Sequence, residues 1–104
     1  MITQEDIDAF AAMAEVNTQD YSYWVEGKIV TEGETRLVEN TLGLVGEAGE
    51  VANKVKKIVR DGKLDKEGIA SELGDCLWYI AAVCRDLGIN MGDVAADNLA
   101  KLAK

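Results

Sequence analysis

The sequence predicts an all-α protein that forms one four-helix domain over residues 1–104. Three observations support this fold class. The chain has no proline, it is rich in the strong helix formers alanine, leucine, glutamate and lysine, and its apolar residues gather on one side of each expected long helix. A chain this short buries a limited core. Because 48% of its residues are apolar, we expect an oligomer that covers the surplus apolar surface.

The first helix is expected from about Gln4 to Val16. Thr3 fits the N-cap position, and Asp6 fits the capping-box partner three residues later. The following stretch, residues 17–33, mixes aromatic, polar and glycine residues. We expect it to be irregular, with at most a short helical turn.

The second helix is expected from about Glu34 to Arg60. Basic residues concentrate near its C-terminal end, where they complement the negative end of the helix dipole. Gly62 then supplies a stop signal, because glycine readily takes the left-handed conformation that ends helices.

The third and fourth helices are expected from about Lys66 to Leu87 and from Met91 to the C-terminus. Asp65 and Asn90 are the respective N-caps. Gly88 separates the two helices.

Composition excludes several classes of function. The net charge of −8 repels phosphate backbones, so we expect no nucleic-acid partner. The absence of histidine excludes Ser-His-Asp catalysis and most zinc sites. No apolar run is long enough to cross a membrane, and the acidic N-terminus is unlike a signal peptide. Cys76 and Cys84 lack CxxC spacing, so we expect reduced core thiols in a cytoplasmic protein.

The second helix carries a polar stripe beside its apolar face. At about 100° per residue, Glu47 and Glu50 share an arc with Asn40 and Lys54. This arc borders the apolar side instead of lying opposite to it. The expected core face comprises Leu44, Ala48, Val51, Ala52, Val55 and Val59.

The third helix repeats this arrangement. Glu72, Asp75 and Tyr79 form a polar edge, and the remaining side is barely polar. A helix that is apolar nearly all round is covered on more than one side, so Asp75 is expected between the core and a subunit contact. The expected core face comprises Ile69, Leu73, Leu77, Ile80, Cys84 and Leu87.

The two acidic stripes indicate a divalent-metal site. A short connection makes these helices antiparallel neighbours, on which carboxylate pairs spaced i, i+3 can converge. Carboxylates beside a core are costly unless they are paired, neutralised or bound to a metal. Hard oxygen ligands favour Mg²⁺, with Mn²⁺ as a substitute. One such pair is usually a solvated helix face, but two pairs on adjacent helices favour the metal site.

The motifs Glu47-Ala-Gly-Glu50 and Glu72-Leu-Gly-Asp75 resemble the ExxE…ExxD signature of MazG-like nucleotide pyrophosphohydrolases, the all-α NTP pyrophosphatase superfamily. The strings GLVGEAGEVANKVKK, ELGDCLWYIA and NLAKLAK are also similar to this family. The resemblance covers about residue 39 to the C-terminus. It implies the four-helix-bundle-like MazG fold, assembled as a homodimer or homotetramer.

The resemblance also implies a reaction. It is the Mg²⁺-dependent hydrolysis of a nucleoside or deoxynucleoside triphosphate to the monophosphate and pyrophosphate, with a metal-activated water. Which carboxylate acts as general base stays open. By position, the metal ligands and catalytic carboxylates would be Glu47, Glu50, Glu72 and Asp75.

Further residues are candidates for substrate binding. Lys54 and Lys101 carry point charges suited to phosphate oxygens, and Asn98 matches a family position near the phosphates or sugar. An ordinary surface or packing role is the competing interpretation for each of them. The candidates for contact with the base or sugar are Tyr79, Trp24 and Asn40.

The sequence bears on three other functions. A non-catalytic helical oligomer that binds nucleotide or metal as a sensor remains the main alternative, since a fold does not guarantee activity. A ferritin-like di-metal protein would usually need Glu-x-x-His motifs. An EF-hand starting at Asp61 would place lysines where a ligand and a glycine are required.

Overall fold

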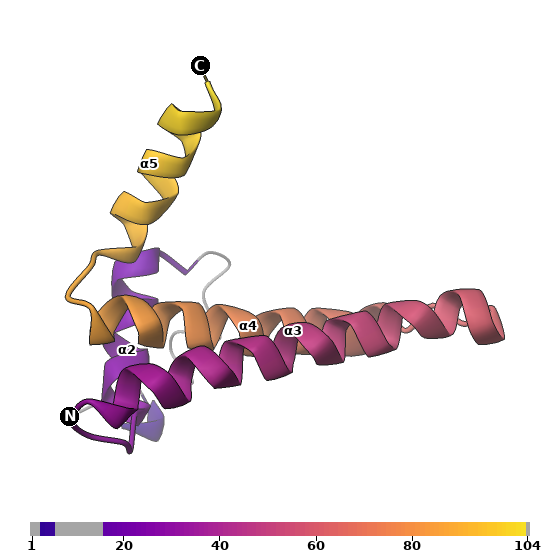
Figure 1. The fold of residues 1–104 in the computed structure, drawn as a ribbon, viewed down its shortest axis with the longest axis horizontal. Coiled ribbons are helices and arrows are strands. Elements are labelled where there is room, and N and C mark those ends of the chain that lie inside the picture. Colours follow the sequence, from indigo (N-terminus) through magenta and orange to yellow (C-terminus); the bar gives the residue numbers. More distant parts are fainter. Residues whose placement is uncertain (1–2, 6–15, 104) are drawn as a thin grey trace.

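The computed structural model describes residues 3–5 and 16–103. This part of the chain is helical and contains no strand, which confirms the all-α class. The expected helix Gln4–Val16, with its capping partner Asp6, lies almost wholly outside the described residues. Within residues 16–103, the helices are α2 (Thr18–Lys28), α3 (Thr35–Asp61), α4 (Lys66–Asp86) and α5 (Met91–Leu102), as shown in Figure 1, and Gln4 and Glu5 are also helical.

Helix α2 corrects the expectation of an irregular segment. Asn17 caps it, because the Asn17 Oδ1 accepts a hydrogen bond of 2.8 Å from the backbone N–H of Asp20. Tyr21, Val25 and Ile29 recur every fourth residue, and they face the same neighbour. That spacing is a helical signal, which the polar and glycine residues between them obscured.

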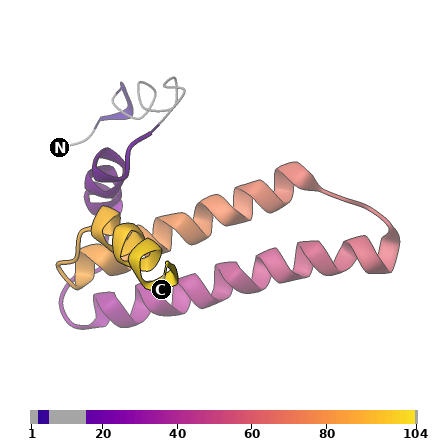
Figure 2. The same cartoon turned by 90° about the horizontal axis from the view of Figure 1, so that it is seen from above.

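Helices α3 and α4 form the predicted antiparallel hairpin, which extends to one side in Figures 1 and 2. Helix α3 ends at Gly62, whose φ of 69° is the left-handed conformation expected there. Asp65 caps α4 by accepting a 2.9 Å hydrogen bond from the backbone N–H of Gly68. Asn90 caps α5 in the same way, through the N–H of Asp93.

The core lies between α2 and the C-terminal half of α4. Val25, Ala81 and Ala82 are fully buried there. The small alanine side chains allow α2 to approach α4 closely. Larger side chains close around this contact, namely those of Tyr21, Trp24, Ile29, Trp78 and Met91.

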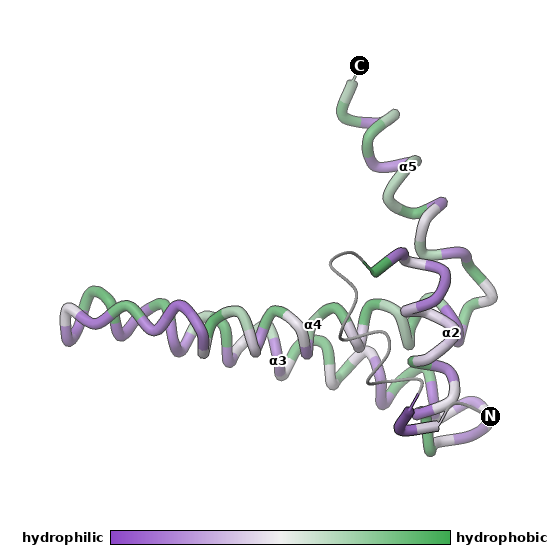
Figure 3. The backbone as a smooth tube through the Cα atoms, turned by 180° about the vertical axis from the view of Figure 1, so that it is seen from behind, coloured by the Kyte–Doolittle hydropathy of each residue, from purple (hydrophilic) through white to green (hydrophobic). Residues whose placement is uncertain are grey.

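The expected core faces of α3 and α4 are largely exposed, which corrects the sequence prediction. On α4, Leu73 is 53% exposed and Leu77 is 42% exposed, while Val59 on α3 is 90% exposed. Of the predicted faces, only Cys84 is buried, with 7% of it exposed. Figure 3 shows apolar residues, in green, along the hairpin and on α5. Among residues 3–5 and 16–103, no further helix covers this side of the hairpin.

Helix α5 rises away from the hairpin (Figure 1) and packs mainly against α2. Its apolar residues Leu99 and Leu102 are about 70% exposed. Among the described residues, no helix has the length and apolarity needed to span a membrane.

Candidate functional site

Three carboxylates from the α3–α4 hairpin converge on one point. Glu47 projects from the middle of α3, and Glu72 and Asp75 project from adjacent turns of α4. One oxygen of each carboxylate lies within 4.8 Å of an oxygen of the other two. Glu47 and Glu72 are half-buried, whereas Asp75 is exposed. The antiparallel pairing thus brings together three of the four predicted metal ligands.

The charges in this cluster are unbalanced. The pKa of Glu47 is raised, first by a hydrogen bond shared with Glu72, then by desolvation and by the neighbouring charges, including that of Glu50. None of the ion pairs formed within the described residues involves these carboxylates. A cluster of hard oxygen donors without a cationic side chain fits a divalent cation such as Mg²⁺.

The fourth predicted ligand, Glu50, lies outside the three-carboxylate cluster. It sits almost one turn beyond Glu47 on α3 and is exposed. Glu72 and Asp75 have the same i, i+3 spacing and do converge, so the spacing alone does not exclude Glu50. Lys54 lies farther along α3, with its Nζ 4.0 Å from the Oδ2 of Asp65 across the hairpin.

Asp75 is exposed in the single chain, so its expected place between the core and a subunit contact stays a prediction. Helix α2 covers the neighbouring face of α4 and stops short of burying the carboxylate. The ring of Tyr21 on α2 nevertheless comes near it. The pKa of Tyr21 is raised by burial and then by the negative charge of Asp75. Tyr21 was not among the predicted site residues.

A cavity of about 340 Å³ opens beside the cluster. Glu47 and Asp75 line its acidic side, and Trp78 and Tyr79 line its aromatic side. The two rings meet edge to face, with centroids 5.1 Å apart and planes at 79°. Tyr79 was predicted at this site, but Trp78 was not. The signal for Trp78 was its position one turn after Asp75.

A smaller cavity of about 180 Å³ shares the aromatic pair. Asn40, from α3, is 5% exposed and is the most buried residue along it. Gly43 allows the aromatic wall to form, because a Cβ at this position would overlap the Tyr79 ring. The other lining residues are Lys28, Ile29, Val30, Thr31 and Glu39.

Behind Asn40 lies a polar network that joins three helices. The Asn40 Nδ2 donates a 2.9 Å hydrogen bond to the Oδ2 of Asp86. Arg36 donates from Nε to the Oδ1 of Asp86 and from Nη2 to both carboxylate oxygens of Glu26, at 2.9 and 2.7 Å. Arg36, Asp86 and Glu26 were not among the predicted site residues. An acidic residue in the last turn of α4, where the helix dipole disfavours it, was the available signal.

The other predicted substrate residues lie elsewhere. Trp24 packs on the core and against Tyr21, with ring centroids 6.1 Å apart, and lines neither cavity. Its Nε1 is buried without a partner among the described residues. Asn98 and Lys101 are exposed on α5, and they also line neither cavity.

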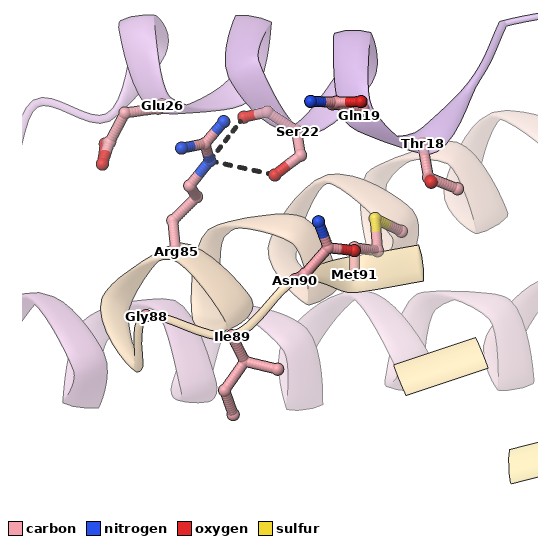
Figure 4. Close-up of a pocket in the computed structure, with 9 residues that line it drawn as sticks. All are labelled: Thr18, Gln19, Ser22, Glu26, Arg85, Gly88, Ile89, Asn90 and Met91. Carbon is pink, nitrogen blue, oxygen red and sulfur yellow. Dashed lines mark hydrogen bonds between the residues drawn. The ribbon is translucent and has the colours of Figure 1, made fainter. Parts of the chain in front are cut away.

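A separate cavity of about 350 Å³ lies where α2 meets the α4–α5 corner, as Figure 4 shows. The Arg85 Nε donates there to the Oγ and the backbone oxygen of Ser22, at 2.9 and 3.1 Å. The only carboxylate in its lining, Glu26, already pairs with Arg36. This cavity therefore lacks the acidic donors of a metal site.

Comparison with known proteins adds a family to this geometry. Residues 37–104 match the family described as MazG nucleotide pyrophosphohydrolase domain. Over 67 residues, the chain is 49% identical to the Gene 37 protein of Mycobacterium phage L5. This match covers 60% of the chain and 59% of the phage protein's length. No solved structure matches the chain.

Proposed function

Because the chain belongs to the MazG nucleotide pyrophosphohydrolase family, we propose that it hydrolyses a nucleoside or deoxynucleoside triphosphate to the monophosphate and pyrophosphate. The observation that carries this proposal is the meeting of Glu47, Glu72 and Asp75 beside a cavity that Glu47 and Asp75 line together with two aromatic rings. An acidic metal site beside a flat aromatic surface suits a ligand with a polyphosphate at one end and a base at the other.

The carboxylates Glu47, Glu72 and Asp75 would hold Mg²⁺, with Glu50, almost one turn beyond Glu47 on α3, as a fourth donor. Mn²⁺ could replace it, because both ions prefer oxygen ligands. When bound, the metal would neutralise the triphosphate, polarise the phosphorus and make a water more acidic. Glu47 supports this assignment: its pKa is raised first by the hydrogen bond with Glu72, then by desolvation, and then by like charges that a cation would offset.

The chain's own residues would supply orientation and proton transfer. Trp78 and Tyr79 would border the base, and Asn40 would contact its edge. Because the chain has no histidine, a carboxylate would take the proton of the attacking water. Lys54 would offer a charge to the phosphates after exchanging its long contact with Asp65.

We also propose that the protein is a homodimer or homotetramer. The exposed apolar side chains of α3, α4 and α5 need cover that a second copy could provide. Asn98 lies on the same face of α5 as Leu102, four residues later. A subunit contact on that face would therefore also involve Asn98 and, at its edge, Lys101. Sedimentation as a stable monomer at micromolar concentration would contradict this assembly.

We place the protein in the cytoplasm on the basis of its two thiols. Cys84 is buried, Cys76 is half-buried, and both are free. Reduced cysteines without a disulfide are typical of that compartment.

The decisive experiment measures pyrophosphate release from a panel of NTPs and dNTPs with Mg²⁺. We expect turnover with at least one of them, and its loss in Asp75→Asn and Glu72→Gln. Glu67→Gln is the matched control, because Glu67 is an exposed carboxylate in the first turn of α4. Nucleotide binding without turnover by the folded wild type would refute the hydrolase and favour the sensor alternative.

A further inference from the structure

Asp86 controls the orientation of the Asn40 side chain. Its own side chain is 2% exposed and sits beside the Arg36 guanidinium. A carboxylate has no hydrogen to donate. One of its oxygens accepts from Arg36, so the other requires a donor from Asn40. The amide must therefore present its NH₂ group to Asp86.

This requirement leaves the Asn40 carbonyl oxygen for another partner. No donor to Asn40 Oδ1 is found within residues 3–5 and 16–103. The atom is also absent from the buried polar atoms that lack a partner in this part of the chain. Asn40 lines the 180 Å³ cavity, which is where a hydrogen-bond donor of a ligand would meet this oxygen.

The position of Asn40 indicates which part of a nucleotide it meets. Asn40 precedes Glu47 by seven residues, or about 10 Å along α3. Trp78 and Tyr79 line the cavities at both ends of this interval. With the phosphates at the carboxylate cluster, the base would lie along the aromatic wall. Asn40 would then meet the edge of the base farthest from the sugar.

We infer that Asp86 and Arg36 are positioning residues that hold the Asn40 carbonyl oxygen toward the cavity, so that the site selects bases with an amino group at their far edge. Cytosine and adenine carry an amino group there, whereas uracil, thymine and hypoxanthine carry a carbonyl oxygen. When such a carbonyl oxygen faces the Asn40 carbonyl oxygen, neither acceptor receives a hydrogen bond. The inference rests on the proposed function and names its substrate class.

The first test uses the wild-type protein and substrates that differ only by an amino-to-keto exchange. We expect kcat/KM for dCTP to exceed that for dUTP by about tenfold or more, and ATP to exceed ITP similarly. Equal values, or a preference for the keto nucleotides, would overturn the inference while leaving hydrolysis established. If no nucleotide is hydrolysed, the proposed function fails. In that case, base selection is measured as the ratio of the Kd values for the α,β-imido analogues of dCTP and dUTP.

The second test uses a substitution at Asp86 to rotate the side-chain amide of Asn40, so that its oxygen and nitrogen exchange places. In Asp86→Asn, the new Oδ1 is expected to keep Arg36 as its donor, which turns the new NH₂ toward Asn40. Asn40 must then rotate and offer its own NH₂ to the cavity. We expect the dCTP-to-dUTP ratio to fall by about tenfold or more. A purely structural role for Asp86 would lower both activities together and leave the ratio unchanged, which would refute the positioning role.

Two further variants complete the test. Asp61→Asn makes the same chemical change at an exposed ion pair with Arg60, and we expect the ratio to stay at the wild-type value. Asn40→Ala removes the acceptor, so the ratio should approach unity. If circular dichroism shows that Asp86→Asn does not fold, the inference is judged on the dCTP-to-dUTP ratios of the wild type and of Asn40→Ala. An Asn40→Ala variant that still prefers dCTP to dUTP would overturn the inference.

Discussion

Replacing Arg36 with alanine should destabilise the protein by about 3 kcal/mol. The substitution leaves the Asp86 carboxylate, which is 2% exposed, without its cation. Removing one partner of a buried ion pair costs about 3–5 kcal/mol. The Asn40 amide still donates to Asp86, which places the expected cost near the lower limit. The contact with Glu26, a 39% exposed side chain, adds about 1 kcal/mol at most.

Urea unfolding, followed by helical circular dichroism, measures this cost. Protein concentration must be held constant, because any subunit association contributes to the apparent stability. Arg60→Ala is the control, since Arg60 is 61% exposed and pairs with the adjacent Asp61. We expect this control to lose about 0.5 kcal/mol or less.

Two outcomes would refute this reasoning. The first is an equal loss of stability in Arg36→Ala and Arg60→Ala, which would mean that Asp86 is not effectively buried. The second concerns the double variant Arg36→Met/Asp86→Leu, which removes both charges and should recover most of the loss. If it is as unstable as Arg36→Ala, then lost packing explains the effect and the uncompensated charge does not.

Three further predictions concern the candidate site. Gly43→Ala should displace the Tyr79 ring and lower kcat/KM about tenfold. Gly46→Ala is the control: the space around Gly46 is open, so the substitution should stabilise α3 by up to about 1 kcal/mol. Mg²⁺ at about 100 times its Kd should stabilise the protein by about 2.7 kcal/mol, and thermal melts should show that Asp75→Asn abolishes this gain. The raised pKa of Glu47 means that its stabilising contribution is present below the ordinary value of 4.5 and is lost as the pH rises through the raised value. In melts without metal, Glu47→Gln should therefore gain stability relative to wild type as the pH rises from about 4 to about 7, and a constant difference would contradict the shift.

The helix boundaries were largely predictable because the signals that set them are local. Asp65, Asn90 and Gly62 mark helix ends through their own hydrogen bonds or backbone conformation. The expected bounds of α3 and α4 agree with the structure to within one residue at each end. Helix α2 was missed because its contact with Ala81 and Ala82 stabilises it, and that contact joins segments far apart in the sequence.

The core was mispredicted for a related reason. Apolar periodicity indicates which face of a helix avoids water, but it does not say what covers that face. On α4, the small residues Ala81 and Ala82 are buried by α2, whereas the larger Leu73 and Leu77 remain exposed in the single chain. The alanines allow the closer approach of a neighbouring helix, which the hydrophobicity of the sequence does not reveal.

The candidate site also has one part that the sequence determined and one part that depended on tertiary packing. By itself, the sequence determined that two acidic pairs follow adjacent helices, because the spacing of residues sets their angle around a helix axis. Only the tertiary structure decided that Glu47, Glu72 and Asp75 meet while Glu50 does not, and that Trp78 joins the cavity. Those outcomes depend on how each helix is rotated about its axis against its neighbours. That rotation is set by packing between residues distant in the chain, and no local pattern encodes it.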